Sequence, residues 1–297
     1  MTLTPDSIEH LQGGLPKASD VQSFDLSAIN RLVEHIPEDM TATAQAGMSV
    51  AAFQSTLSKQ AQWLPVDPPQ PGSTSIGALL AGNVTGPRRF GFGTIRDWLI
   101  GIAVVLPNGR LLRNGGKVVK NVAGFDLCKL FVGSRGMLGV IVEATFKLLP
   151  LPESEVFLKR ECESLDEAAF LIERIWNSDL QPHVLDLHRL ENAPLMLVLG
   201  LAGAKADMEA QVDNARDMGI TDLGDLAHDA SFRSSSHTTV SVPPGQLSEK
   251  LPNGEPFVAR AGNGIYYHYG EPIPHKPTAL EQRIKDAFDP KGILPAP

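Results

Sequence analysis

The chain has 297 residues, of which 42% are hydrophobic and 20% are charged, so we expect a packed globular protein of two domains. Its formal net charge of -8 is spread along the chain and argues against nucleic acid as a partner, because phosphate backbones bind clustered Lys and Arg. The longest apolar run, residues 98–106, is too short to span a membrane, and the first residues lack a secretory signal pattern. We therefore expect a soluble, cytoplasmic protein.

The first half of the chain predicts strands and helices joined by loops rich in glycine and proline. Ser49 and Ser75 are suited to cap helices, and Pro107 to Gly109 predict a tight hairpin turn. In the last strand, the apolar residues at alternate positions from Val140 to Leu148 are expected to share one face. Strands are expected over residues 21–26, 41–46, 97–106, 110–113 and 138–148, and helices over residues 50–60, from 76 onward and over 125–132.

Pro150-Leu-Pro152 interrupts the chain, and we place a domain boundary there, between residues 1–150 and 151–297. The second domain begins with a strand, a helix opened by a capping box at Ser164, two strands, and a helix that ends at Gly219. This order predicts a ferredoxin-like α+β domain. Beyond it we expect a polar loop over residues 225–236, strands over 258–260 and 265–269, and a last helix capped by Thr278 and Glu281.

Three glycine-rich stretches in the first half, residues 74–86, 90–97 and 133–141, predict a binding surface for a large ligand. Each leaves backbone N–H and C=O groups unshielded, and a flavin needs such groups along its diphosphate and at the edge of its rings. The helix start at Ser75 is a candidate anion site, and Gly77 is expected to turn its bare face to the cofactor. A single stretch is read equally well as an ordinary turn, but three together favour a ligand.

A nicotinamide dinucleotide is not expected. Gly133, Gly136 and Gly139 follow a predicted helix and precede a strand, whereas the dinucleotide fingerprint follows a strand and opens a helix. The order of elements is therefore wrong for that fingerprint.

Two runs, residues 82–97 and 115–141, resemble the FAD-binding domain of the vanillyl-alcohol oxidase and p-cresol methylhydroxylase (PCMH-type) superfamily. Within the second run, Lys120-Asn-Val-Ala-Gly-Phe-Asp126 is most similar to the FAD-binding subunits of glycolate oxidase. The resemblance is dense over residues 20–150 and weak beyond. It implies an α+β protein with an N-terminally shortened PCMH-type FAD-binding domain, followed by an α+β domain like that of FAD-linked oxidases.

The resemblance also implies which residues contact FAD. Residues 74–77 are assigned to the diphosphate or ribityl chain, and Asn83, Thr85 and Gly86 to the flavin. Residues 139–141 are assigned to the adenine or the ring system through their backbone. Arg96, with Arg88 and Lys120, could meet a phosphate or a substrate carboxylate, although solvation at the surface is the alternative for each. The implied contacts are Thr74, Ser75, Ile76, Gly77, Asn83, Thr85, Gly86, Arg96, Gly139, Val140 and Ile141.

The chain departs from the superfamily pattern in three places. Only Gly13-Gly-Leu-Pro16 is similar to the end of the Gly-Gly-Gly-Thr-type loop that wraps the diphosphate, so we expect part of the cofactor cradle to be missing. Ala261-Gly-Asn-Gly264 is at most an echo of the His-x-Gly-Asp-Gly-Asn segment of substrate-oxidising relatives, and the catalytic residues therefore stay unassigned. The tail Leu294-Pro-Ala-Pro297 also differs from the usual Asn-Pro-Gly.

No metal site is expected. Cys128 and Cys162 have no partner ligands nearby in the sequence and are predicted as buried free thiols. His183 and His188 are five residues apart, which puts them on opposite faces of a strand, and no ligand set completes a site. His268 is a candidate general base, but a histidine of the core or its rim is the favoured reading.

The resemblance implies the FAD-binding subunit of a glycolate or other 2-hydroxy-acid oxidase complex. Hydride would pass from the hydroxy-acid carbon to the flavin, and electrons then to an iron–sulfur subunit and a quinone, with a larger flavin subunit as a further partner. No membrane span is expected, although partners could attach the chain to a membrane. FAD is expected to be noncovalent, because neither His nor Cys lies in the three glycine-rich stretches. A scaffold subunit without cofactor and a flavoenzyme that acts alone remain alternatives.

Overall fold

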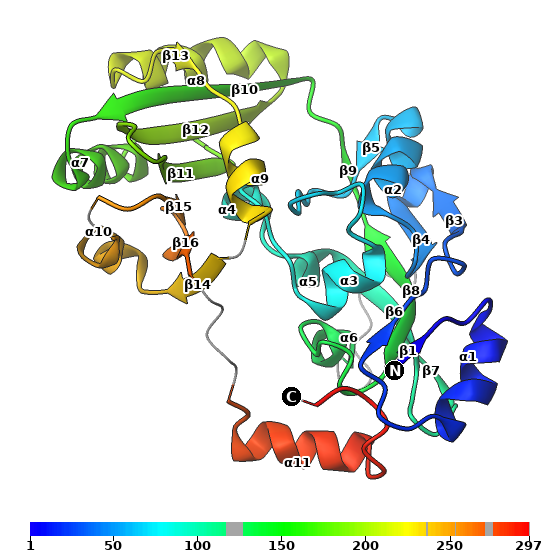
Figure 1. Ribbon diagram of the computed structural model, residues 1–297. Coiled ribbons are helices and arrows are strands. Elements are labelled where there is room, and N and C mark those ends of the chain that lie inside the picture. Colours follow the sequence, from blue (N-terminus) through cyan, green and yellow to red (C-terminus); the bar gives the residue numbers. More distant parts are fainter. Residues whose placement is uncertain (117–126, 236, 253, 271–275, 297) are drawn as a thin grey trace. The chain divides into compact units, whose positions relative to one another are not determined.

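The computed structural model describes residues 1–116, 127–235, 237–252, 254–270 and 276–296, and the chain forms two compact units (Figure 1). The first unit comprises Met1–Thr85, Thr94–Leu151 and His275–Pro297, and the second comprises Gly86–Gly93 and Pro152–Pro274. The expected boundary after residue 150 lies one residue before the main change of unit. Gly86–Gly93, which was expected in the first domain, belongs to the second unit. The end of the chain, which was expected in the second domain, belongs to the first unit.

The first unit is built on an antiparallel five-stranded sheet in the order β3-β4-β8-β6-β7. β8 lies at the centre of this sheet, and the predicted hairpin joins β6 to β7. Two short pairs, β1 with β2 and β5 with β9, lie outside it. The strands are β1 (Thr2–Leu3), β2 (Ser23–Phe24), β3 (Leu32–Ile36), β4 (Thr41–Gln45), β5 (Gln62–Trp63), β6 (Leu99–Val105), β7 (Leu111–Gly115), β8 (Val140–Lys147) and β9 (Leu149–Pro150).

Short helices cover this sheet, and α2 and α3 begin where the sequence predicts, whereas α1 was not predicted and α5 overlaps the start of the strand expected over residues 97–106. The Ser49 and Ser75 side chains cap α2 and α3, and Val50, Phe53 and Leu57 of α2 are buried against the sheet. No helix of the described residues is long and apolar enough to cross a membrane. The helices of the first unit are α1 (Ile8–Gly14), α2 (Val50–Leu57), α3 (Ile76–Ala81), α5 (Ile95–Trp98), α6 (Leu127–Phe131) and α11 (Ala279–Phe288).

β8 contains an irregularity that the alternating sequence pattern did not predict. Ala103 pairs with Glu143 and Val104 with Ile141, so Val142 is an extra residue between them. Because of this bulge, Val140 and Val142 pack into one apolar cluster while Ile141, Ala144 and Phe146 pack into another. The expectation that Val140 through Leu148 share one face is therefore wrong, since one inserted residue exchanges the two faces.

The second unit has a seven-stranded sheet in the order β13-β10-β12-β11-β15-β16-β14. Its first four strands have the ferredoxin-like order, and β15, β16 and β14 extend that sheet. Its strands are β10 (Ser154–Cys162), β11 (Val184–Arg189), β12 (Leu195–Gly203), β13 (Asp222–Leu223), β14 (His237–Ser241), β15 (Phe257–Arg260) and β16 (Ile265–Tyr269). Its helices are α4 (Arg89–Phe92), α7 (Leu165–Trp176), α8 (Lys205–Asp217), α9 (Ala227–Arg233) and α10 (Leu247–Lys250).

α9 occupies the segment expected to be a polar loop. Its polar residue Asp229 is buried and forms an ion pair with Arg260 of β15, and Phe232 packs with residues of the sheet. A buried aspartate with a partner far away in the sequence looks like a surface residue in a hydropathy pattern, which is why the helix was missed. Cys128 and Cys162 are buried free thiols, as predicted.

A buried ion pair holds the end of the chain in the first unit. Lys285 of α11 lies 2.6 Å from Asp289, and its ammonium also donates to the carbonyl oxygens of Met137 and Leu294, both at 3.1 Å. The Asp289 carboxylate in turn accepts the amides of Ile293 and Leu294 at 2.9 and 2.8 Å. All polar atoms of the pair are thereby engaged, so the last residues are fixed against the loop that precedes β8.

Replacement of this pair should destabilise the protein strongly. Lys285→Met leaves Asp289 buried without its cation, and we expect a loss of about 3–5 kcal/mol in the free energy of unfolding in urea. The matched control is Arg216→Met, which removes an ion pair to Asp213 whose side chains are 58% and 70% exposed and should cost under about 1 kcal/mol. Equal losses for the two variants would contradict the structural role of Lys285.

The same pair gives a pH dependence. Burial raises the pKa of Asp289, but hydrogen bonds from Lys285 and from the amides of Ile293 and Leu294 outweigh it and leave the pKa lowered. The stability gained from the charged carboxylate is present above the pKa of an unfolded aspartate, about 3.9, and is lost as the pH falls through the lower folded pKa. The difference between the wild type and Lys285→Met should therefore shrink below about pH 4.

Gly77 in α3 approaches β4 more closely than a larger residue could. A Cβ atom at this position would lie 3.1 Å from the Cβ of Ala46 and 3.2 Å from its carbonyl oxygen. The Gly77 amide donates to that same oxygen at 2.7 Å. The close packing of α3 on the residue after β4 is thus a reason for glycine at this position besides the predicted contact with the cofactor.

Gly77→Ala should therefore lower the melting temperature of the flavin-free protein. We expect a loss of about 1–3 kcal/mol from the crowded contact with Ala46. Gly13→Ala is the control, because a Cβ in that helical position meets nothing within 4 Å and alanine favours a helix. If Gly77→Ala weakened flavin binding and left the melting temperature unchanged, the glycine would face the ligand and the packing argument would fail.

Candidate functional site

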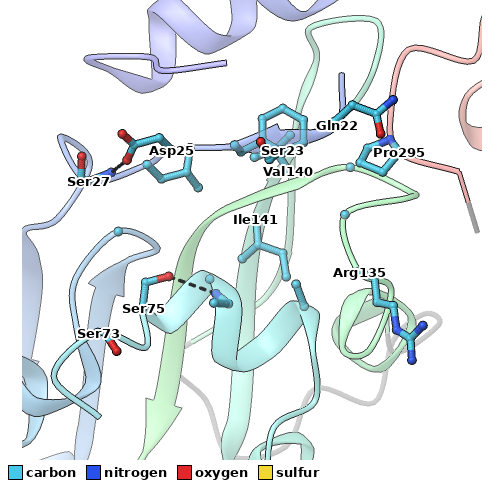
Figure 2. Close-up of a pocket in the computed structure, with 18 residues that line it drawn as sticks. Gln22, Ser23, Asp25, Ser27, Ser73, Ser75, Arg135, Val140, Ile141 and Pro295 are labelled. Carbon is cyan, nitrogen blue, oxygen red and sulfur yellow. Dashed lines mark hydrogen bonds between the residues drawn. The ribbon is translucent and has the colours of Figure 1, made fainter. Parts of the chain in front are cut away.

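The first unit contains a cavity of about 410 Å³ (Figure 2). Residues of β2 and the loop after it, the end of β4, one face of α3, the loop before β8 and the C-terminal tail form its wall. It is therefore assembled from segments far apart in the sequence. The described residues that line it are Gln22, Ser23, Phe24, Asp25, Leu26, Ser27, Gly47, Ser73, Ser75, Gly77, Ala78, Ala81, Arg135, Gly136, Gly139, Val140, Ile141 and Pro295.

The cavity brings together five of the residues that the sequence analysis implied as cofactor contacts. Three come from the beginning of β8 and the residue before it, and two from α3 and its cap. The small residues of α3 leave room at the wall, since Gly77, Ala78 and Ala81 all line it. The five implied contacts on the wall are Ser75, Gly77, Gly139, Val140 and Ile141.

The other six implied contacts do not line this cavity. The Thr74 hydroxyl donates to the carbonyl oxygen of Pro69 at 3.1 Å, and the Ile76 side chain is buried in the apolar core. The exposed Arg96 donates to the carbonyl oxygen of Lys129. The remaining three, Asn83, Thr85 and Gly86, lie in the loop after α3, where Gly86 begins the segment that belongs to the second unit.

The start of α3 is not an open anion site. Its first amides already have acceptors: Ile76 donates to Met48 at 2.8 Å, Gly77 to Ala46 at 2.7 Å, and Ala78 to the Ser75 hydroxyl at 3.1 Å. An amide that donates within the protein is not available to a phosphate. These hydrogen bonds give no support to an anion site at the start of α3. Two of the three acceptors, Met48 and Ala46, lie in a separate segment of the chain.

The loop between α6 and β8 forms the opposite part of the wall. Gly133, Arg135 and Gly136 all have left-handed backbone conformations, with φ of 83°, 51° and 80°. The amides of Gly133 and Arg135 donate to Leu80 and Ala81 at the end of α3, both at 2.9 Å. These hydrogen bonds fix the loop beside the small-residue face of α3.

Arg135 was missed by the sequence analysis, which named Arg88, Arg96 and Lys120 as the cations of interest. Its place between two glycines of a stretch already identified was the available signal. Among the described residues that line the cavity, Arg135 is the one cation and Asp25 the one carboxylate. The Ser27 amide and hydroxyl lower the pKa of Asp25, so that side of the cavity carries a negative charge at neutral pH.

The residues of the cavity fit part of a flavin dinucleotide. The volume lies within the range of small-molecule sites, and the Ser27, Ser73 and Ser75 side chains offer polar groups between small residues. A Cβ atom at Gly136 would meet only the Phe24 ring, at 4.0 Å, so this glycine leaves space that a side chain would fill. Backbone exposed in this way is what the phosphates and ring edges of a flavin require.

Arg88 is held by another group and is not free for a phosphate. In the second unit its guanidinium lies 2.8 Å from Glu155, whose carboxylate is also 3.0 Å from Nε2 of His183. Burial raises the pKa of Glu155, but its contacts with His183 and Arg88 outweigh burial and leave the pKa lowered. Lys120, the other cation named from the sequence, lies outside the described residues.

A second buried polar cluster lies between α9 and the sheet of the second unit. Arg260 is paired with Asp186 and Asp229, and Nε2 of His188 lies 3.5 Å from Asp186. The ring of His228 is 5.2 Å from that of His188. Burial, and then repulsion from His188, lowers the pKa of His228 to about 4. His228 is therefore neutral in the folded protein at neutral pH.

None of the three histidines considered from the sequence forms part of a metal site. His183 and His188 each have a separate carboxylate beside them, and Nδ1 of the half-buried His268 lies 3.0 Å from the Tyr269 carbonyl oxygen. Within the described ranges, no group of three or more His, Cys, Asp or Glu side chains could hold a metal ion.

The protein should lose stability as the pH falls from about 6.5 towards 4. The unfolded chain takes up a proton on His228 near its ordinary pKa of 6.5, whereas the folded protein does so only at about 4. The contribution of neutral His228 is thus complete above pH 6.5 and is lost through this window. His228→Gln should flatten the fall in melting temperature over this range, with the exposed His10→Gln as control. An unchanged pH profile in His228→Gln would contradict the argument.

Comparisons with known proteins show what the chain is similar to. A family model described as an FAD binding domain matches residues 10–115. The chain is 38% identical over 148 residues to the glycolate oxidase subunit GlcE of Escherichia coli (strain K12), an alignment that covers 50% of this chain and 42% of that protein. It is 36% identical over 171 residues to the glycolate oxidase subunit GlcD of Bacillus subtilis (strain 168), which covers 58% of this chain and 36% of that protein.

Two further relatives extend the comparison. A D-2-hydroxyglutarate dehydrogenase of Xanthomonas citri pv. viticola is 38% identical over 149 residues, which are 50% of this chain and 32% of that protein. A solved structure of alkyldihydroxyacetonephosphate synthase has a TM-score of 0.74 at 18% identity, covers 99% of this chain and 76% of that chain, and shows the fold alone.

The matches have a limited extent, since the chain spans less than half the length of the curated relatives named here. They nevertheless confirm the predicted α+β fold, the resemblance on which it was based and FAD as the cofactor of the matched domain. Residues 10–115 thus match an FAD binding domain, and the chain is similar to the glycolate oxidase subunits GlcE and GlcD.

Proposed function

We propose that this chain is the FAD-binding subunit of a complex that oxidises glycolate or a related 2-hydroxy acid. The observation that supports this most directly is the cavity of the first unit, whose wall contains Ser75, Gly77 and the three residues from Gly139 to Ile141. The resemblance in sequence implies the same residues as FAD contacts. The names of the relatives, glycolate oxidase subunits and D-2-hydroxyglutarate dehydrogenase, support a 2-hydroxy acid as the substrate.

The residues proposed to hold FAD are those that line the cavity. The hydroxyls of Ser73 and Ser75 would bind polar groups of the cofactor, and the backbone of Gly139 to Ile141 would lie along it. Thr74, Ile76, Asn83, Thr85, Gly86 and Arg96, implied by the resemblance, lie away from this wall, and a contact from any of them would need a part of the cofactor outside this cavity.

When bound, FAD supplies a two-electron acceptor for the carbon that carries the hydroxyl group of the substrate. The contribution of the first unit is to bind and orient the cofactor and to shield one part of it from water by the apolar wall of Val140 and Ile141. No catalytic base is assigned. His268 is partly exposed and its Nδ1 is engaged by the Tyr269 carbonyl, which gives no support to such a role.

We propose a multi-subunit assembly as the context of this activity. The two relatives named as subunits of glycolate oxidase support such an assembly. An iron–sulfur subunit that accepts the electrons and a larger flavin subunit remain proposals that rest on the resemblance. The cytoplasmic location and peripheral attachment to a membrane through partners are likewise predictions from the sequence.

The first test is whether the purified chain retains FAD without a covalent bond. We expect visible flavin absorbance after reconstitution, and release of the yellow colour into the supernatant on acid precipitation. The physical reason is that neither His nor Cys is among the described residues lining the cavity, so the side chains that most often tether a flavin are missing from its wall. Colour in the pellet would contradict noncovalent binding, and no flavin at all would favour the scaffold alternative.

The same preparation tests the reaction. Dye reduction with glycolate and with D-lactate should be slow for the chain alone and should rise when the proteins encoded beside it are added. Rapid turnover by the isolated chain would contradict the partner-dependent model and favour a flavoenzyme that acts alone. A complex that contains this chain with bound FAD but oxidises neither acid would overturn the proposed substrate class.

A further inference from the structure

Resting on the proposed function, the structure points to a specific anion site within the cavity. We propose that the Arg135 guanidinium and the Gly136 amide bind the diphosphate of the flavin dinucleotide. The start of α3, which the sequence suggested for this role, has no free amides, because Ile76, Gly77 and Ala78 donate within the protein. A diphosphate that enters the cavity must therefore find its positive partner elsewhere on the wall.

Arg135 is the available cation. It is exposed, it lines the cavity, and none of the described carboxylates forms an ion pair with it. The other arginines considered are engaged, since Arg88 is paired with Glu155 and Arg96 donates to Lys129. A planar guanidinium can donate two parallel hydrogen bonds to phosphate oxygens, which a solvated surface arginine leaves unused.

Two unsatisfied groups lie beside Arg135. The Gly136 amide has no hydrogen bond to any residue that the structure describes, and Gly136 itself lines the cavity. The Ser134 hydroxyl is buried and has no partner among the described residues. A buried polar group without a partner, such as the Ser134 hydroxyl, is uncommon in folded proteins, and the Gly136 amide is available to donate to a bound anion.

The backbone of this loop is held in a form that costs free energy. Arg135 has a φ of 51°, a conformation that residues with a side chain seldom adopt, between two glycines of positive φ. The hydrogen bond from the Arg135 amide to Ala81 holds the residue there. Residues held in such sparsely populated conformations occur often at ligand-binding sites, which agrees with a role for this loop in phosphate binding.

The charges at the cavity favour one orientation of the bound cofactor. Figure 2 shows Asp25 and Arg135 on opposite sides of the site, with Ile141 between them. The ionised Asp25 repels phosphate from its own side, and Arg135 attracts it to the other. In Figure 2 the Arg135 side chain points away from the other labelled residues, so the proposed contact with a phosphate includes a rotation of this exposed side chain towards the cavity.

The test compares FAD with riboflavin, which has the same ring system but no phosphate. Binding is measured by equilibrium dialysis for the wild type, for Arg135→Gln and for Arg135→Lys. We expect Arg135→Gln to raise the Kd for FAD about tenfold to a hundredfold, because it removes charge-assisted hydrogen bonds, and to leave the Kd for riboflavin unchanged. Arg135→Lys, which keeps the charge but loses the planar fork, should give a smaller increase.

Arg110→Gln is the matched control, because Arg110 is an exposed arginine of the same unit that does not line the cavity. It should leave the Kd for FAD unchanged, and the melting temperature of every variant should match that of the wild type. The difference in FAD binding between the wild type and Arg135→Gln should also shrink as salt is raised, since the interaction is ionic.

The outcomes separate this inference from the proposed function. If the wild type binds FAD and Arg135→Gln binds it equally well, the phosphate role of Arg135 is overturned while the proposed function stands. An equal loss for riboflavin and FAD would also overturn it, because riboflavin offers no phosphate. If the wild type binds no FAD in the presence of its partners, the proposed function itself fails, and this inference fails with it.

Discussion

The backbone of Ala46 connects the three segments on which the cavity depends. Its carbonyl oxygen accepts the Gly77 amide at the start of α3, and its amide donates to Val142, the extra residue in β8. These two hydrogen bonds bring a helix, the end of a strand and a bulge together at one residue. Glycine at position 77 favours this approach, since a Cβ atom there would be 3.1 Å from the Ala46 side chain, a crowded contact. A change at any of these residues would therefore alter the wall.

The rest of the wall is contributed by segments from both ends of the first unit. Pro295 reaches it because the Lys285 and Asp289 pair fixes the tail after α11, and residues 22–27 reach it from the N-terminal part of the chain. The positive-φ loop around Arg135 is tied to the end of α3 by backbone hydrogen bonds. The cavity is thus a product of contacts between distant segments, and the ion pair that fixes the tail also supports the wall.

The second unit uses buried charge in a different way. One face of its sheet packs apolar residues against α7 and α8, whereas Arg260, Asp186 and Asp229 form an ion-paired cluster beneath α9. Such clusters add little net stability over apolar residues of similar size, but loss of one member leaves an unpaired buried charge. The cluster therefore holds α9 in one position on the sheet, and the neutral His228 makes this arrangement sensitive to acid.

Local patterns in the sequence determined the capped helices α2, α3, α7 and α11, most strands, the ferredoxin-like order of the second unit and the FAD-binding domain. These features depend on neighbouring residues, such as Ser49 and Ser75 at helix starts, or on a stretch of glycines. The tertiary structure alone decided the bulge at Val142, the helix α9 and the return of α11 to the first unit. It also decided that the α3 amides are occupied and that Arg135 lies at the cavity. Each of these depends on a partner far away in the chain, and no local pattern records which distant residue will supply a hydrogen bond or a counter-charge.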